Sequence, residues 1–185
     1  MIDGKYTDYP TKVLNGEIVA GELIKLACKR FLSYLESDNI IFDTRKADKV
    51  VTFIEKLKLS TGKFAHSNFK LSDWQKFVIY YVYGLVYKDS GLRVTRELYL
   101  QLSRKSGKTA LASAMALYHL VADGENDGQV IFAANSTAQA QLAFTMATNY
   151  VSYIDPKGKY FKKYRDSIKF PPTKSIMKVV SADAN

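Results

Sequence analysis

The chain contains very few of the side chains that build disulfides and metal centres. Cys28 is its only cysteine, and His66 and His119 are its only histidines. A single thiol excludes a disulfide within the chain and a Cys/His metal site, and it agrees with a reducing compartment. Cys28 lies in a helical pattern, which predicts a packing role. His119 also lies where a helix is expected, which favours a core or helix-end role over a catalytic one.

Long apolar runs and acidic residues are scarce as well. No apolar run approaches the 18 residues of a membrane-spanning helix, and the opening residues MIDG do not begin a signal peptide. We therefore expect a cytoplasmic protein. Lys and Arg number 27 against 18 Asp and Glu, which gives a formal net charge of +9. This excess favours an acidic partner such as a nucleic-acid backbone, although lysines that are merely solvated give the same composition.

The length of 185 residues and the hydrophobic content of 47% predict one domain, or one domain with a helical extension. Residues 1–16 are polar and turn-rich, which predicts a loosely held arm. Apolar residues recur at helical spacing in residues 17–36 and again in 44–57, before a polar stretch at 60–68. We expect a helical extension over residues 1–62 and a second domain over 63–185. The expected stripes are Val19, Leu23, Ala27, Phe31 and Leu35 in the first helix, and Ala47, Val50, Val51, Ile54 and Leu57 in the second, which Asp43 or Thr44 would cap.

Residues 97–121 carry the most informative pattern of the chain. Leucines alternate up to Leu102 in a predicted strand over 94–102, a turn ends in Ser-Gly-Lys-Thr at 106–109, and residues 110–122 are apolar on all sides, as in a helix packed on a sheet. A strand, a turn and a helix in this order are typical of a phosphate-binding loop. Lys108 would then neutralise the β- and γ-phosphate oxygens of ATP, and the Thr109 hydroxyl would bind Mg²⁺.

The motif is incomplete, because the pattern GxxxxGK(S/T) requires a glycine five residues before Gly107, where the chain has Leu102. The surrounding strand and helix favour a nucleotide site. The alternative is a solvated turn in which Gly107 only provides a bend.

The following residues predict a parallel α/β sheet. A buried strand is expected over 129–134, Ser136 and Gln139 form a capping box for a helix to about residue 151, and a last strand is expected over 176–181. Alternating strands and helices indicate parallel strands joined by crossovers, with ligands at their carboxyl ends. Asn135 and Gln139 could face DNA or nucleotide there, although Gln139 is at least as well explained as a cap.

Gln75 has two possible roles. It lies three residues after Ser72, so it could close a capping box at the start of a helix whose buried face includes Phe77 and Leu85. Its side-chain amide could instead pair with N6 and N7 of an adenine base.

A basic and aromatic stretch covers residues 157–169. Six basic residues alternate there with Tyr160, Phe161, Tyr164 and Asp166. This composition suits a groove for a nucleic-acid backbone, and it equally suits a half-buried helix with a solvated basic face.

The turn SRKSGKT at residues 103–109 resembles the deviant Walker A loop of the large terminase subunits of tailed bacteriophages, whose consensus is close to xRKNGK(S/T) and also lacks the first glycine. Ser106 stands where that family more often has Asn. The resemblance covers nearly the whole chain, most specifically residues 71–144. Further matching stretches are LSDWQ at 71–75 with Gly84 nine residues beyond, AANS at 133–136 leading to Gln139-Ala140, and SADA at 181–184.

The resemblance implies an ASCE-type P-loop NTPase with a parallel sheet flanked by helices, acting as the ATP-driven motor that packages viral DNA. It implies ATP and Mg²⁺ as cofactors, double-stranded DNA, the small terminase subunit and the capsid portal as partners, a possible ring oligomer, and the host cytoplasm as location. It places adenine beside Gln75. Arg104 and Lys108 are the implied catalytic residues, Thr109 the implied Mg²⁺ ligand, and Ser103, Arg104, Lys105, Ser106, Gly107, Lys108 and Thr109 the implied nucleotide-binding residues.

One expected part of such an ATPase is missing. Hydrolysis requires an apolar strand that ends in Asp, often followed by Glu. The strand at 129–134 ends in Asn135, and Asp183 follows Ser-Ala rather than an apolar run. We therefore expect an N-terminal fragment that is inactive alone, from a terminase that is also an endonuclease. The rival hypotheses are another nucleic-acid-dependent ATPase of the helicase type and a basic nucleic-acid-binding module without enzymatic activity.

Overall fold

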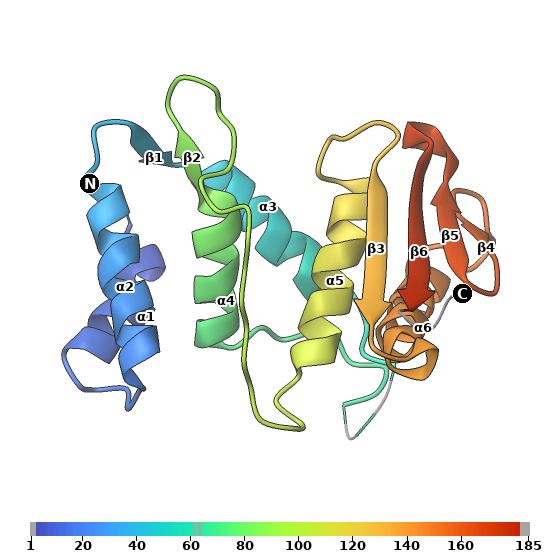
Figure 1. The fold of residues 1–185 in the computed structure, drawn as a ribbon, viewed down its shortest axis with the longest axis horizontal. Coiled ribbons are helices and arrows are strands. Elements are labelled where there is room, and N and C mark those ends of the chain that lie inside the picture. The colour runs from blue at the N-terminus through green and yellow to red at the C-terminus, as the bar shows by residue number, and fades with distance from the viewer. Residues whose placement is uncertain (1–2, 61, 63, 182–185) are drawn as a thin grey trace. The chain divides into compact units, whose positions relative to one another are not determined.

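The computed structural model describes residues 3–60, 62 and 64–181 of the chain (Figure 1). The chain forms two compact units that interleave in sequence. The first comprises Met1–Thr52 and Leu71–Gln101, and the second Phe53–Lys70 and Leu102–Asn185. Each unit contains residues from both sides of residue 62. The units are defined by compactness alone, and the domain boundary at residue 62 stays a prediction.

The first unit is mainly helical and contains one short antiparallel pair of strands, β1 with β2. The last residues of its helix α3 belong to the second unit. Its elements are α1 (Gly4–Leu14), α2 (Glu22–Leu35), β1 (Ile40–Phe42), α3 (Thr44–Glu55), α4 (Asp73–Ile79), the π-helix η1 (Tyr80–Gly84) and β2 (Leu85–Tyr87).

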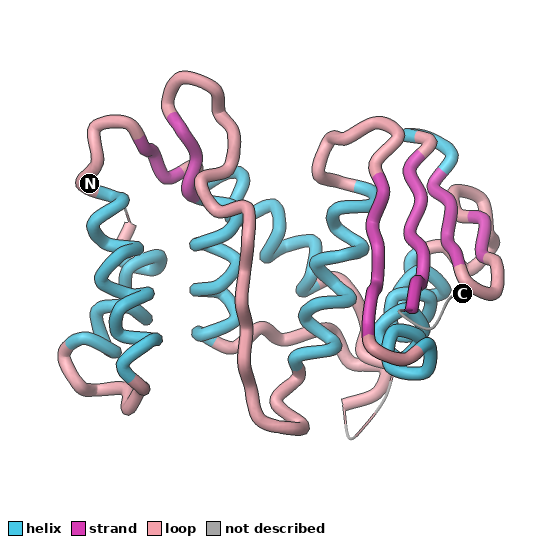
Figure 2. The backbone as a smooth tube through the Cα atoms, in the orientation of Figure 1, coloured by secondary structure: helices cyan, strands magenta, loops and turns pink. Residues whose placement is uncertain are grey.

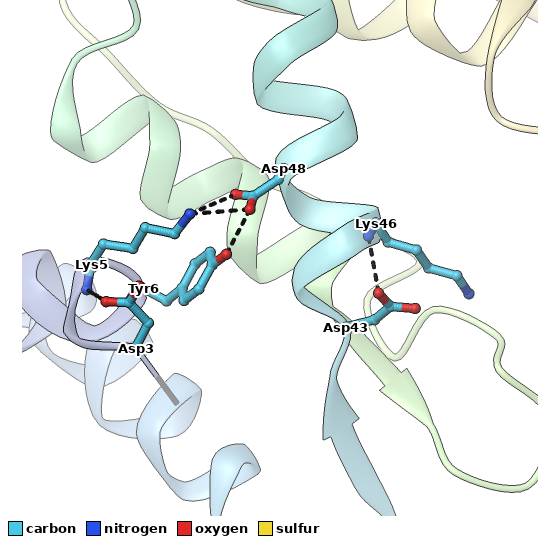
Figure 3. A network of polar contacts seen from close by, with 6 residues as sticks. All are labelled: Asp3, Lys5, Tyr6, Asp43, Lys46 and Asp48. Carbon is cyan, nitrogen blue, oxygen red and sulfur yellow. Dashed lines mark hydrogen bonds and ion pairs between the residues drawn. The ribbon is translucent and has the colours of Figure 1, made fainter. Parts of the chain in front are cut away.

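Helix α1 corrects the prediction of a loose arm over residues 1–16. The Asp3 carboxylate accepts a hydrogen bond from the Lys5 backbone N–H at 3.1 Å and so caps the helix. Tyr6 and Val13 are buried in the core. The Asp48 carboxylate on α3 accepts hydrogen bonds from the Tyr6 hydroxyl at 2.8 Å and from the Lys5 ammonium at 3.1 Å (Figure 3). These buried side chains and the hydrogen bonds to Asp48 stabilise α1, although the composition of residues 1–16 alone suggests a coil.

Helix α2 is present as expected, but part of its predicted apolar stripe is wrong. Val19 lies before the helix and is 98% exposed, and Leu23 in its first turn is 80% exposed. The buried residues are Cys28 and Phe31. The Phe31 ring packs edge to face against Phe77 at a centroid distance of 5.4 Å, so the helix turns this side toward the core. The packing role expected for Cys28 is therefore confirmed.

Two predicted helix caps of this unit are present. The Asp43 side chain accepts a hydrogen bond from the Lys46 backbone N–H at 3.0 Å (Figure 3). Gln75 Oε1 accepts hydrogen bonds from the Ser72 backbone N–H at 2.9 Å and from its hydroxyl at 3.1 Å, and the Gln75 side chain is buried. Ser72 and Gln75 thus form the capping box.

The second unit is a layer of two helices on a four-stranded sheet (Figure 2). The strand order is β3-β6-β5-β4, in which β3 and β6 are parallel and the other pairs antiparallel. The α/β class is confirmed, with a mixed sheet in place of the expected wholly parallel one. The elements are α5 (Lys108–Val121), β3 (Gln129–Ala134), α6 (Thr137–Ile154), β4 (Lys162–Lys163), β5 (Ser167–Phe170), the 3-10 helix η2 (Pro171–Thr173) and β6 (Ser175–Ser181).

One face of this sheet is buried against the helices. Ile168 on β5 and Met177 on β6 are directly opposite each other and fully buried, and the Phe132 ring on β3 meets Phe144 of α6 at 6.5 Å. The two helices are also joined to each other, because the Ser113 hydroxyl of α5 donates to the Ala143 carbonyl of α6 at 2.8 Å. The residues that alternate with these point to the opposite face.

The predicted strand at residues 94–102 is wrong, and so is the helix that is one of the two alternatives for residues 157–169. Residues 94–102 are not a strand: within the described residues no strand pairs with residues 96–102, and Tyr99 is 86% exposed. An extended segment becomes a strand only when a neighbour receives its backbone hydrogen bonds. Residues 157–169 are not a helix, because β4 and β5 pair as an antiparallel hairpin. Among the described residues, the structure contains no helix that meets both the length and the apolar content of a membrane span.

Candidate functional site

The predicted phosphate loop is a closed turn directly before helix α5. The Ser106 hydroxyl donates a hydrogen bond to the Ser103 carbonyl at 2.7 Å and holds the two ends of the turn together. Gly107 is the N-cap of the helix, and its carbonyl accepts the Leu111 N–H at 3.0 Å. The sequence pattern of turn and helix is confirmed here, although the preceding strand is not.

The backbone of this turn has an unusual conformation at two alternate residues. Lys105 has φ of 65° and Gly107 has φ of 80°, both in the left-handed region. Glycine adopts this conformation without strain, whereas a residue with a side chain such as Lys105 pays about 1 kcal/mol or more. Alternation of left-handed residues turns successive N–H groups toward one side and forms a concave anion site.

The N-terminus of α5 adds a second source of positive potential. Gly107 offers no side chain to cap the first turn, and the first turn contains no acidic residue. The N–H groups at the start of a helix have no partner within it, and the helix dipole leaves partial positive charge there. A phosphate group would satisfy both.

The charged side chains of the loop are exposed. Arg104, Lys105 and Lys108 all point a cationic group to solvent, and Thr109 is exposed beside Lys108. No carboxylate pairs with any of these three cations in the part of the chain that the structure describes. Four adjacent features of one segment, namely left-handed backbone at Lys105 and Gly107, a helix N-terminus, free cations and a hydroxyl, therefore favour a polyphosphate with its metal ion.

The loop after β3 lies at the same end of the second unit as the phosphate loop (Figure 1). The Ser136 side chain accepts a hydrogen bond from the Gln139 backbone N–H at 3.4 Å and caps α6. The side chains of Asn135 and Gln139 are exposed. The Ser136 half of the predicted capping box is thus confirmed, whereas the described residues show no return bond from the Gln139 side chain to Ser136. A ligand contact by Asn135 or Gln139 stays a prediction.

Other singled-out residues lie elsewhere. Nδ1 of the His119 ring and the Asp123 carboxylate share a hydrogen bond of 2.8 Å at the C-terminal end of α5. The predicted helix-end position of His119 is therefore confirmed. The structure gives Gln75 its cap contacts, while its possible contact with adenine stays a prediction. Asp183 lies outside the described residues. The left-handed Lys105 is the feature that sequence reasoning missed, because no residue pattern signals such a conformation at a lysine.

Known proteins share sequence and fold with this chain. The family described as "Terminase large subunit, ATPase domain" matches residues 73–185. The large terminase subunit of Enterobacteria phage HK97 is 31% identical over 114 residues, which are 60% of this chain and 21% of that protein. The crystal structure of the HK97 large terminase matches with a TM-score of 0.62 at 26% identity, over 76% of this chain and 28% of that one. The chain thus spans about a fifth of the length of this relative. Since the family matches more than half of its residues, the chain belongs to the terminase large subunit ATPase domain family.

Proposed function

We propose that this chain binds Mg·ATP through the loop at residues 103–109 and forms part of the ATPase of a phage DNA-packaging motor. The observation that carries the proposal is the left-handed backbone at Lys105 and Gly107 leading into helix α5, whose first turn has no side-chain cap. Membership of the terminase ATPase family supports the same assignment.

Each residue of the loop has a role that its chemistry fits. The backbone N–H groups of residues 103–107 would surround the β-phosphate, and the Lys108 ammonium would neutralise the β- and γ-phosphate oxygens. The Thr109 hydroxyl would bind Mg²⁺, which supplies charge neutralisation at the transferred phosphate. Arg104 and Lys105 would add positive charge near the γ-phosphate, where negative charge spreads as the bond to the leaving group breaks.

The activity of the whole protein is inferred from the resemblance to the large terminase subunits. ATP hydrolysis would drive double-stranded viral DNA into a preformed capsid in the host cytoplasm, and the whole protein would also be an endonuclease. The small terminase subunit and the capsid portal are the expected partners, and several copies would form a ring during packaging.

The nucleotide site is tested by calorimetric titration of Mg·ATP and Mg·ADP into the protein and into Lys108→Ala. Since Lys108 is exposed and unpaired in the described structure, the variant should keep its circular dichroism spectrum and melting temperature while losing measurable binding. Lys88→Ala, which removes an exposed lysine of the first unit, is the matched control and should bind as the wild type does.

Two results would reject the proposal. Equal affinity in the wild type and Lys108→Ala would reject the loop at residues 103–109 as the nucleotide site. Absence of any nucleotide effect on the folded protein would favour the rival reading of a basic nucleic-acid-binding module.

A further inference from the structure

Three lysines gather on the open face of the sheet in the second unit. Lys162 on β4 is directly opposite Lys169 on β5, so their side chains point to the same side. Lys169 is opposite Ile176 on β6, and Lys178 follows two residues later on the same face. We call Lys162, Lys169 and Lys178 the lysine face. By contrast, Lys163 points to the other side, where its ammonium donates to the Ser152 hydroxyl of α6 at 2.9 Å.

The arrangement of these charges is unfavourable within the protein. Like charges placed directly opposite each other on neighbouring strands destabilise a sheet. Among the described residues of the four strands, none on this face is acidic. The surrounding segment adds to the excess: residues 157–174 contain seven basic residues and one acidic one, a net charge of +6 out of +9 for the whole chain. An anionic partner would relieve this repulsion.

The hairpin that carries the lysines is firmly held. The Asp155 carboxylate, which is 5% exposed, accepts hydrogen bonds from the backbone N–H groups of Lys159, Tyr160 and Phe161 at 2.8 to 2.9 Å. The buried Phe161 ring packs on Phe170 of β5 at a centroid distance of 5.0 Å. These contacts fix the loop before β4, so less conformational entropy is lost when a partner binds.

The exposed tyrosines of the hairpin are engaged by the cations. The Lys169 ammonium lies 5.6 Å from the centre of the Tyr164 ring, and the Lys159 ammonium lies 5.1 Å from that of Tyr160. A cation over one face of each ring orients the lysine and leaves fewer open faces on which unpaired bases could stack. This favours a duplex, in which the bases are already stacked and the phosphates face outward.

We propose that the lysine face and the adjoining hairpin bind the phosphate backbone of duplex DNA without reading its sequence. The surface is separate in sequence from the phosphate loop, at residues 103–109. The inference extends the proposed function, because duplex DNA is the polymer that a packaging motor moves. The tests of DNA binding and of nucleotide binding are independent, so either proposal can fail without the other.

The test measures binding of a fluorescein-labelled duplex of 30 base pairs by anisotropy over a series of salt concentrations. The variant is Lys162→Gln/Lys169→Gln/Lys178→Gln. Loss of three phosphate contacts should weaken binding by about tenfold or more at low salt and reduce the slope of log affinity against log salt by about 3. The matched control is Lys29→Gln/Lys56→Gln/Lys88→Gln, which removes equal charge from other exposed positions and should keep the wild-type slope.

Folding is checked by thermal melting. Because Lys162 and Lys169 repel each other, the triple variant should melt at or above the wild-type temperature. If it melts lower, Lys162→Gln alone provides the comparison, with an expected change of about 1 in the salt slope. Mg·ADP titration of the same variants should show wild-type affinity, which separates a failure here from a failure of the nucleotide site.

Three outcomes overturn the proposal. The first is an equal loss of affinity in the lysine-face variant and its control, since this would mean that DNA responds only to the net charge of the protein and not to the position of these lysines. The second is an affinity that does not change with salt. The third is tighter binding of a single strand of the same length that is lost in Tyr160→Ala/Tyr164→Ala, which would assign the surface to unpaired bases.

Discussion

The hydroxyl of Ser106 donates a hydrogen bond of 2.7 Å to the backbone carbonyl of Ser103. Lys105, which lies between these two residues, is in the left-handed region. The bond therefore closes the turn around a left-handed residue, which is the kind of backbone that anion-binding loops use. A loop that is shaped before its ligand arrives loses less entropy on binding.

The first prediction concerns this bond. Ser106→Ala removes the donor and should weaken Mg·ADP binding by about two- to tenfold, since a single hydrogen bond contributes roughly 0.5–1.5 kcal/mol. Ser106→Asn, the residue more usual at this position in the large terminases that the loop resembles, should bind within about twofold of the wild type, because its amide can donate to the same carbonyl. Calorimetry on the three proteins provides the comparison. An alanine variant that binds as tightly as the wild type would show that the bond does not shape the site.

The second prediction concerns Gln75 and uses the single tryptophan, Trp74. If Gln75 contacts adenine, ADP should change the fluorescence of Trp74, whereas inorganic phosphate should not. Gln75→Ala should also lower the free energy of unfolding by about 1 kcal/mol, because it opens the capping box with Ser72. If saturating ADP leaves the emission unchanged while calorimetry shows binding, Gln75 acts only as a cap.

The third prediction concerns the acid stability of the loop before β4. Burial raises the pKa of Asp155, but hydrogen bonds from the backbone N–H groups of Tyr160, Phe161 and Lys159 outweigh it, so the pKa lies below the usual value. A lowered pKa in the folded state stabilises the protein above the unfolded-state pKa of about 3.9, and this stabilisation is lost as the pH falls below it. Asp155→Asn should therefore melt several degrees lower at pH 7.

The difference between the two proteins should begin to shrink as the pH falls below about 4, where the carboxylate of the unfolded wild-type chain takes up a proton, and should vanish below the lowered pKa of the folded state. Thermal melts from pH 7 to pH 3 measure this convergence. Asp166→Asn is the control, because Asp166 is exposed and contacts Arg165 only at 3.8 Å. A constant gap over the whole pH range would mean that the Asn variant loses packing and not a charge.

The sequence predicts those parts of the molecule whose signals are local. The caps at Ser72 and Ser136 and the strand at 129–134 follow from residues close together in the chain, and they are confirmed. The loop at 103–109 is also placed correctly before its helix. Such patterns report local geometry directly.

The parts that sequence reasoning missed depend on distant partners. Helix α1 is stabilised by burial of Tyr6 and by its bond to Asp48, 42 residues away. Residues 157–169 form a strand hairpin because β5 pairs with β6, which the basic and aromatic composition of the segment does not reveal. The predicted strand at 94–102 fails for the converse reason, since its residues 96–102 have no partner strand in the described structure. Pairing of strands is a tertiary property, and propensity alone does not determine it.

The last prediction separates nucleotide binding from hydrolysis. The groups that would bind phosphate, namely the N–H groups of the loop and Lys108, are present in this chain. Hydrolysis also requires a carboxylate that completes the Mg²⁺ shell and positions the attacking water. No apolar strand ending in Asp-Glu occurs in the 185 residues. We expect the chain to bind Mg·ATP and to release phosphate hardly faster than the uncatalysed reaction.

The measurement is phosphate release under single-turnover conditions, with Lys108→Ala as the background control. A longer chain should hydrolyse ATP if it contains an apolar strand that ends in Asp-Glu. If the 185-residue protein itself turns over ATP and loses this activity in Lys108→Ala, the catalytic carboxylate lies within the present sequence. Asp183→Asn is then the variant to examine, because Asp183 belongs to the stretch SADA at 181–184 that matches the large terminases. Loss of turnover with retained Mg·ADP affinity in that variant would identify Asp183 as the residue that acts on water.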